Sequence, residues 1–94
     1  MSETSLFSAR SERVEWLLAI VGDELRHATE SHPPMHSPHE GHSVIREELE
    51  ELWAHVKSDT GQSAEAGVEA FQVAAMALRY VHDLLVDQGP PYGD

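Results

Sequence analysis

Residues 37–56 read SPHEGHSVIREELEELWAHV, and this segment decides the fold. Ser37 and Glu40 form a capping box, with Pro38 in the first helical position. The apolar residues that follow recur every three or four positions, which places them on one face of an α-helix. The members of this expected buried stripe are Ile45, Leu49, Leu52, Trp53 and Val56. The segment predicts a helix over about residues 38–58.

A second helical pattern precedes this segment and covers about residues 5–29. Pro33 and Pro34 must interrupt it, because proline lacks an amide donor and disfavours the α conformation in the residue before it. A loop rich in proline and histidine is therefore expected over residues 30–37. The apolar stripe of the first helix comprises Phe7, Val14, Leu17, Leu18, Val21, Leu25 and Ala28.

A third helix is expected over about residues 63–88, with Ser63 as its N-cap and Gly89 closing it. Gly61 supplies the left-handed residue that ends the preceding helix. The third helix is apolar over more than half of its circumference, so it should be the central one. Its apolar residues are Phe71, Val73, Ala74, Ala77, Leu78, Val81, Leu84 and Leu85. The sequence thus predicts an all-α fold of three long helices in one domain, residues 1–94.

Two features suggest oligomerisation: the small size of the chain, and a pair of apolar residues that lie off the main stripe of the first helix. A chain of 94 residues buries a limited core when alone. Trp16 and Ile20 lie one turn apart on a face of the first helix that its main stripe does not use. Chance exposure of two residues explains them equally well. We expect a homodimer whose interface uses the central helix together with Trp16 and Ile20.

Composition excludes several classes of function. The chain has 17 Asp and Glu against 6 Lys and Arg, a net charge of −11, which argues against a nucleic-acid binder. It has no cysteine, which excludes disulfides, thiolate zinc sites and cysteine nucleophiles. No apolar run approaches the length of a membrane span, and the first thirteen residues do not resemble a signal peptide. The expectation is a soluble cytoplasmic protein without a membrane association.

The informative polar residues lie on the second and third predicted helices. Glu48 and Glu51 fall on one flank of the second helix, at the spacing that lets two carboxylates hold one cation. Glu69 and Gln72 have the same spacing on the polar stripe of the third helix. If the two helices pack antiparallel, these pairs can face each other and offer oxygen ligands suited to Mg²⁺ or Mn²⁺. The alternative is a solvated acidic face, which is common on helices.

The same residues carry a resemblance to a known family. The motif Glu47-Glu48-x-x-Glu51, followed by Glu69-x-x-Gln72, resembles the signature of the MazG-like all-α nucleoside triphosphate pyrophosphohydrolases. The likeness extends over about residues 37–85. It implies a MazG-like helical bundle that hydrolyses a nucleoside or deoxynucleoside triphosphate to the monophosphate and pyrophosphate with Mg²⁺ or Mn²⁺. It also implies metal ligation by Glu48, Glu51 and Glu69, with Glu47 as a catalytic group that positions water.

One residue departs from the family motif. Gln72 stands where the family has aspartate, so this fourth expected ligand brings an amide oxygen and no charge. No cluster of basic residues is evident for the triphosphate, and Arg79 and His55 are the expected substrate-binding groups near the motif. A second hypothesis is therefore a non-catalytic helical interaction protein that keeps the fold and has a degraded metal site.

The histidines support a third, weaker hypothesis. Seven are present, and His32, His36, His39 and His42 lie close enough in sequence to form a Zn²⁺ or Ni²⁺ site. Polar residues of a loop and helix start explain them as well. Glu24-x-x-His27 has the spacing of half a di-iron site in a helical bundle, but such sites need a second copy of the motif, so we reject that interpretation.

Overall fold

The computed structural model describes residues 3–86, and side chains over residues 9–86. It contains three helices, α1 (Glu3–Ser31), α2 (Pro38–Asp59) and α3 (Ala64–Leu84), and no β-strand within these residues. The predicted all-α class and three-helix order are confirmed over this part of the chain. The third helix ends at Leu84, earlier than the expected residue 88, which lies outside the described residues.

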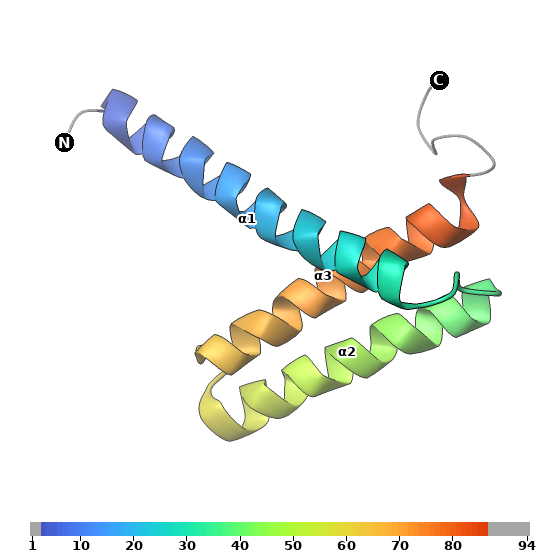
Figure 1. Ribbon diagram of the computed structural model, residues 1–94. Coiled ribbons are helices and arrows are strands. Elements are labelled where there is room, and N and C mark those ends of the chain that lie inside the picture. The colour runs from blue at the N-terminus through green and yellow to red at the C-terminus, as the bar shows by residue number, and fades with distance from the viewer. Residues whose placement is uncertain (1–2, 87–94) are drawn as a thin grey trace.

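The central position predicted for the third helix is confirmed. α2 and α3 run side by side in opposite directions (Figure 1). The C-terminal part of α1 crosses α3 (Figure 1). The N-terminal part of α1 extends away from the other two helices (Figure 1). None of the described helices has the length and apolar character needed to cross a membrane.

The predicted helix starts are confirmed, with one difference of detail. Ser37 Oγ accepts a hydrogen bond from the Glu40 amide at 3.1 Å. The Glu40 carboxylate reaches back to the amide of His36 at 3.0 Å, one residue before the partner that a capping box uses. Ser63 caps α3 through the Ala66 amide at 3.1 Å. Each cap satisfies an amide that the first helical turn leaves without a partner.

The turn between α2 and α3 is closed by Asp59. Thr60 and Gly61 both have left-handed backbone angles, with φ of 78° and 75°. The Asp59 carboxylate accepts hydrogen bonds from the Gly61 amide at 3.0 Å and from the Ser63 hydroxyl at 3.1 Å. This turn reverses the chain within a few residues, so α2 and α3 are brought together antiparallel.

Hydrogen bonds hold the connection between α1 and α2 against the C-terminal end of α3. Arg79 and Asp83 form an ion pair at 3.2 Å, and their side chains are only 8% and 3% exposed. The Arg79 guanidinium also donates to the Pro33 carbonyl at 3.0 Å. The Met35 amide donates to the Asp83 carboxylate at 3.0 Å. One ion pair on α3 therefore fixes the Pro-rich connection at two points.

The expected apolar stripes of the first two helices are only partly buried. The buried apolar side chains among the described residues are small or flexible: Ala28, Met35, Ala66, Ala75 and Met76. On α1, Val14 and Leu18 are 51% and 60% exposed, and on α2, Leu49 and Trp53 are 51% and 54% exposed. The stripes are only partly covered because, within the described residues of one chain, α1 and α2 each pack against α3 and not against each other. Trp16 is exposed, as expected, whereas Ile20 is half-buried.

Gly41 is buried where α2 crosses the end of α3. A Cβ atom at this position would lie 2.5 Å from Tyr80 Cδ2 and 3.2 Å from Met35 Sδ. We expect Gly41→Ala to lower the free energy of unfolding by about 1 kcal/mol, because overpacking outweighs the better helix propensity of alanine. Gly67→Ala on α3 is the matched control, since nothing lies within 4 Å of its Cβ position. Alanine there should raise stability in urea unfolding followed by circular dichroism; a gain at both positions would contradict the packing described for Gly41.

Candidate functional site

The acidic residues singled out from the sequence converge between α2 and α3. Glu48 and Glu51 lie one turn apart on α2, and Glu69 faces them from α3. One carboxylate oxygen from each residue lies within 4.8 Å of the others. We call Glu48, Glu51 and Glu69 the carboxylate cluster. In residues 9–86 this is the one set of three or more His, Cys, Asp or Glu side chains close enough to share an ion.

The electrostatics of the carboxylate cluster are unfavourable when all three groups are charged. Partial burial, together with the charges and hydrogen bonds of Glu51 and Glu69, raises the pKa of Glu48 to about 7. Burial and the neighbouring Glu51 carboxylate also raise the pKa of Glu69. Near neutral pH the cluster therefore holds a proton that a bound cation would displace. The donor set of hard oxygens fits Mg²⁺ or Mn²⁺.

His55 lies one turn beyond Glu51 and is held in place by Asp59. Its Nδ1 lies 2.8 Å from the Asp59 carboxylate. This hydrogen bond, with the negative charges of Asp59, Glu69 and Glu65, raises the pKa of His55. The same bond, together with the Gly61 amide, lowers the pKa of Asp59. Since Nδ1 carries the proton shared with Asp59, Nε2 is the nitrogen left for a ligand.

Three other residues predicted for the site have different surroundings. Glu47 is exposed on α2. Gln72 turns its amide nitrogen toward α1 and donates to the Glu24 carboxylate at 2.7 Å. Arg79 is buried and bound to Asp83 and Pro33, so its guanidinium serves the connection between α1 and α2. Metal ligation by Gln72 and substrate binding by Arg79 stay predictions that these contacts do not favour.

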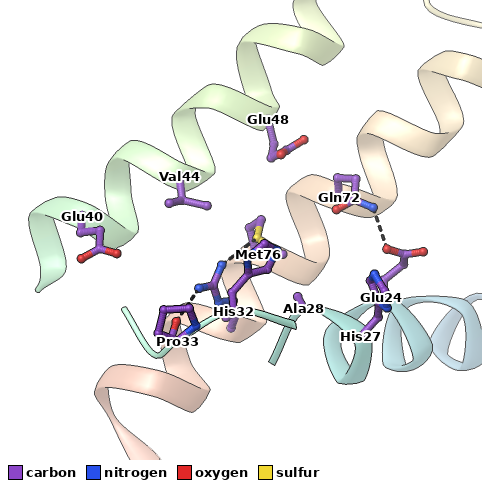
Figure 2. A pocket seen from close by; sticks show the side chains of 11 residues that line it. Glu24, His27, Ala28, His32, Pro33, Glu40, Val44, Glu48, Gln72 and Met76 are labelled. Atoms are coloured by element: carbon purple, nitrogen blue, oxygen red, sulfur yellow. Dashed lines mark hydrogen bonds between the residues drawn. The ribbon is translucent and has the colours of Figure 1, made fainter. Parts of the chain in front are cut away.

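A pocket of about 430 Å³ adjoins the carboxylate cluster. All three helices contribute to its wall, and Figure 2 shows side chains from each of them around the opening. Glu48 belongs both to the pocket wall and to the carboxylate cluster. The remaining lining residues are Glu24, His27, Ala28, His32, Pro33, Glu40, Val44, Gln72, Met76 and Arg79.

Sequence reasoning missed the contribution of α1 to this site. Glu24 and His27 carried a recognisable spacing, but it was assigned only to the di-iron hypothesis and rejected. Their place in the pocket depends on how α1 crosses α3, which no local pattern encodes.

The four neighbouring histidines do not assemble into a metal site within the described residues. His32 lines the pocket, whereas His39 and His42 lie on the exposed surface of the first turns of α2. His36 is exposed and contributes its backbone amide to Glu40.

Comparisons of the chain with known protein families, with curated proteins and with solved structures found no match. The chemistry of the carboxylate cluster and its pocket therefore carries the functional interpretation.

Proposed function

We propose that this protein is a MazG-like nucleoside triphosphate pyrophosphohydrolase that uses Mg²⁺ or Mn²⁺. The observation that carries the proposal is the convergence of Glu48, Glu51 and Glu69 within 4.8 Å. These are the three carboxylates of the motif that resembles the family signature. A pocket large enough for part of a nucleotide opens beside them, since small-molecule sites commonly measure about 300–1,000 Å³.

In the proposed reaction, water attacks the α-phosphorus and the bond to the β-phosphate oxygen breaks, giving a nucleoside monophosphate and pyrophosphate. A divalent ion at the carboxylate cluster would neutralise phosphate charge and lower the pKa of water. Glu48, Glu51 and Glu69 hold that ion. Glu47, on the exposed side of the same helix, positions water, and His55 contacts a phosphate through Nε2.

The supply of positive charge makes the proposed reaction depend strongly on the metal. Arg79 is bound to Asp83, and Arg46 is paired with Glu50 at 3.0 Å. Lys57 lies over the Trp53 ring, 5.6 Å from its centroid. Each of these three cations contacts a partner outside the carboxylate cluster, so the proposed reaction would rely on divalent ions to neutralise triphosphate charge.

The second candidate is a non-catalytic helical interaction protein. The Gln72–Glu24 hydrogen bond favours it, because the side chain at the position of the family aspartate links α3 to α1. The exposed Leu49 and Trp53 on α2 favour it as well. In this case the carboxylate cluster would be the remnant of a metal site.

The experiment that separates the two is a pyrophosphate-release assay with all common ribo- and deoxyribonucleoside triphosphates, first with Mg²⁺ and then with Mn²⁺. Release of pyrophosphate together with the matching monophosphate supports the enzyme. Phosphate release alone would indicate another hydrolase chemistry. A folded protein that releases no pyrophosphate from any of these nucleotides would leave the interaction protein as the better interpretation.

The apolar surface left by one chain supports a homodimer as part of the proposal. No large side chain is fully buried among the described residues, and Val14, Trp16 and Leu18 are at least half exposed on the extended part of α1. A small domain with so little buried volume gains stability by covering such a face with a second copy.

Leu18→Glu is expected to shift the protein toward monomer, because burying a carboxylate in an apolar interface is unfavourable. Light scattering after size-exclusion chromatography at several concentrations measures this. Gln62→Glu adds the same charge at an exposed turn position and should leave the mass unchanged. A monomeric wild-type protein at all concentrations would rule the dimer out.

A further inference from the structure

The wall of the pocket carries hydrogen-bond acceptors that neither the proposed metal nor the fold uses. Glu24 on α1 and Gln72 on α3 are joined at 2.7 Å, with the amide nitrogen as donor (Figure 2). A carboxylate can only accept, so the Gln72 amide must present its nitrogen to Glu24 and keep its oxygen on the other side. Within the described residues, neither the Gln72 oxygen nor the second oxygen of Glu24 accepts another hydrogen bond.

The pocket also offers apolar surface beside its polar side chains. Ala28, Val44 and Met76 contribute its apolar surface, one from each helix. Met76 and Ala28 are buried members of the small core, so this part of the pocket is fixed by packing. A methionine thioether packs favourably against an aromatic ring.

Glu48 joins the pocket to the carboxylate cluster. A ligand whose phosphates reach an ion at Glu48, Glu51 and Glu69 would therefore place its other end in the pocket. For a nucleotide that end is the base. The acceptors of Glu24 and Gln72 would then meet the hydrogen-bonding edge of the base.

We propose that Glu24 and Gln72 select bases that carry an amino group, so that the substrates are cytosine, adenine or guanine nucleotides and uracil and thymine nucleotides are rejected. This inference rests on the proposed function. Cytosine donates two N–H groups from its amino nitrogen, which match two acceptor oxygens. Uracil carries a carbonyl oxygen at the same position, so it offers no donor there to the Glu24 carboxylate.

The size of the discrimination follows from the cost of leaving such acceptors unpaired once a bound base has displaced water from the pocket wall. An unsatisfied polar pair corresponds to about a tenfold loss of affinity or more. A site built to accept hydrogen bonds from a substrate rejects the analogue that lacks the donor much more strongly than an apolar pocket rejects a misfit. Cytosine and uracil are the sharpest pair to compare because they have nearly the same shape.

The test is calorimetric titration of the full chain with α,β-methylene analogues of dCTP and dUTP in the presence of Mg²⁺. These analogues are not cleaved at the α–β bond, so affinity is measured apart from turnover. We expect the cytosine analogue to bind about tenfold more tightly or better. In Glu24→Gln the preference should fall toward unity, because glutamine can donate to the uracil carbonyl.

Glu50→Gln is the control, since Glu50 pairs with Arg46 on the exposed side of α2 and should leave the preference unchanged. Equal affinity for both analogues, tighter binding of the uracil analogue, or an unchanged preference in Glu24→Gln would overturn the inference while leaving the proposed function intact. Binding of no nucleotide analogue at all would instead remove the proposed function and the inference with it.

Discussion

Replacement of Glu48 by glutamine should reduce Mg²⁺-dependent pyrophosphate release by about a hundredfold or more, since even partners outside the ligand shell typically contribute ten- to a hundredfold. Glu48 lies at the meeting point of the carboxylate cluster and the pocket. Glutamine keeps the size of the side chain and removes its charge, so the fold should persist while the ion loses one of its three anionic ligands.

The same substitution should have the opposite effect on the stability of the metal-free protein. The pKa of Glu48 is raised from 4.5 to about 7 in the fold. Between these values the folded state binds more protons than the unfolded state, so stability decreases as the pH rises through this window. At pH 8, Glu48→Gln should therefore melt at a higher temperature than the wild type, and at pH 5, where Glu48 is already protonated, the difference should be small.

Thermal unfolding with and without Mn²⁺ measures the stability of the metal-free protein and the stabilisation that the ion adds. The wild type should gain stability from the ion at pH 8 and lose most of that gain at pH 6, where protons compete for the cluster. Glu50→Gln should behave as the wild type because its partner is Arg46. Undiminished activity and undiminished stabilisation by Mn²⁺ in Glu48→Gln would refute the assignment of this residue as a ligand.

Replacement of Asp83 by alanine should cost about 3–5 kcal/mol of unfolding free energy, which is typical when one partner of a buried ion pair is removed. Arg79 would remain buried with an uncompensated charge, since both side chains are less than one-tenth exposed. The Met35 amide would also lose its acceptor. In so small a domain this loss is comparable to the whole stability, so the variant should be largely unfolded at 25 °C.

Asp23→Ala is the matched control for this prediction. Asp23 pairs with Arg26 at 3.7 Å on the surface of α1, where the two side chains are 80% and 66% exposed. Its loss should change the stability by less than about 1 kcal/mol. Similar urea midpoints for the Asp83 and Asp23 variants would show that the Arg79–Asp83 pair contributes nothing beyond a surface pair.

Asp83 also contributes to the loss of stability in acid. Burial by itself raises the pKa of this carboxyl, but hydrogen bonds from His82 and the Met35 amide, with the charge of Arg79, lower it overall. The stabilisation is therefore complete above the ordinary aspartate pKa and is lost as the pH falls through the lower folded value. The urea midpoint of the wild type should therefore decrease as the pH falls through this range.

The sequence predicted the features that depend on near neighbours. Ser37, Ser63 and Gly61 act at the helix ends through atoms within a few residues, so their roles could be read directly. The convergence of Glu48 with Glu69 could be predicted as well. It needs only the spacing on each helix and the short antiparallel turn between them.

The features that depend on α1 could not be predicted. The Glu24–Gln72 hydrogen bond joins residues 48 positions apart and requires a particular crossing of α1 over α3. The exposure of Leu49 and Trp53 has the same origin, since a helical stripe shows which face is apolar and not what covers it. Arg79 was expected to bind substrate, but its guanidinium donates to the Pro33 carbonyl and holds the connection between α1 and α2.

The turn closed by Asp59 has a consequence for the order in which the chain assembles. α2 and α3 are joined by a turn whose hydrogen bonds span two to four positions, whereas the connection after α1 reaches α3 across 48 positions. Local contacts form early because they require little loop closure. The α2–α3 hairpin should therefore nucleate folding and α1 should dock afterwards, so backbone amides in the extended part of α1 should exchange with deuterium long before those at the centre of the hairpin.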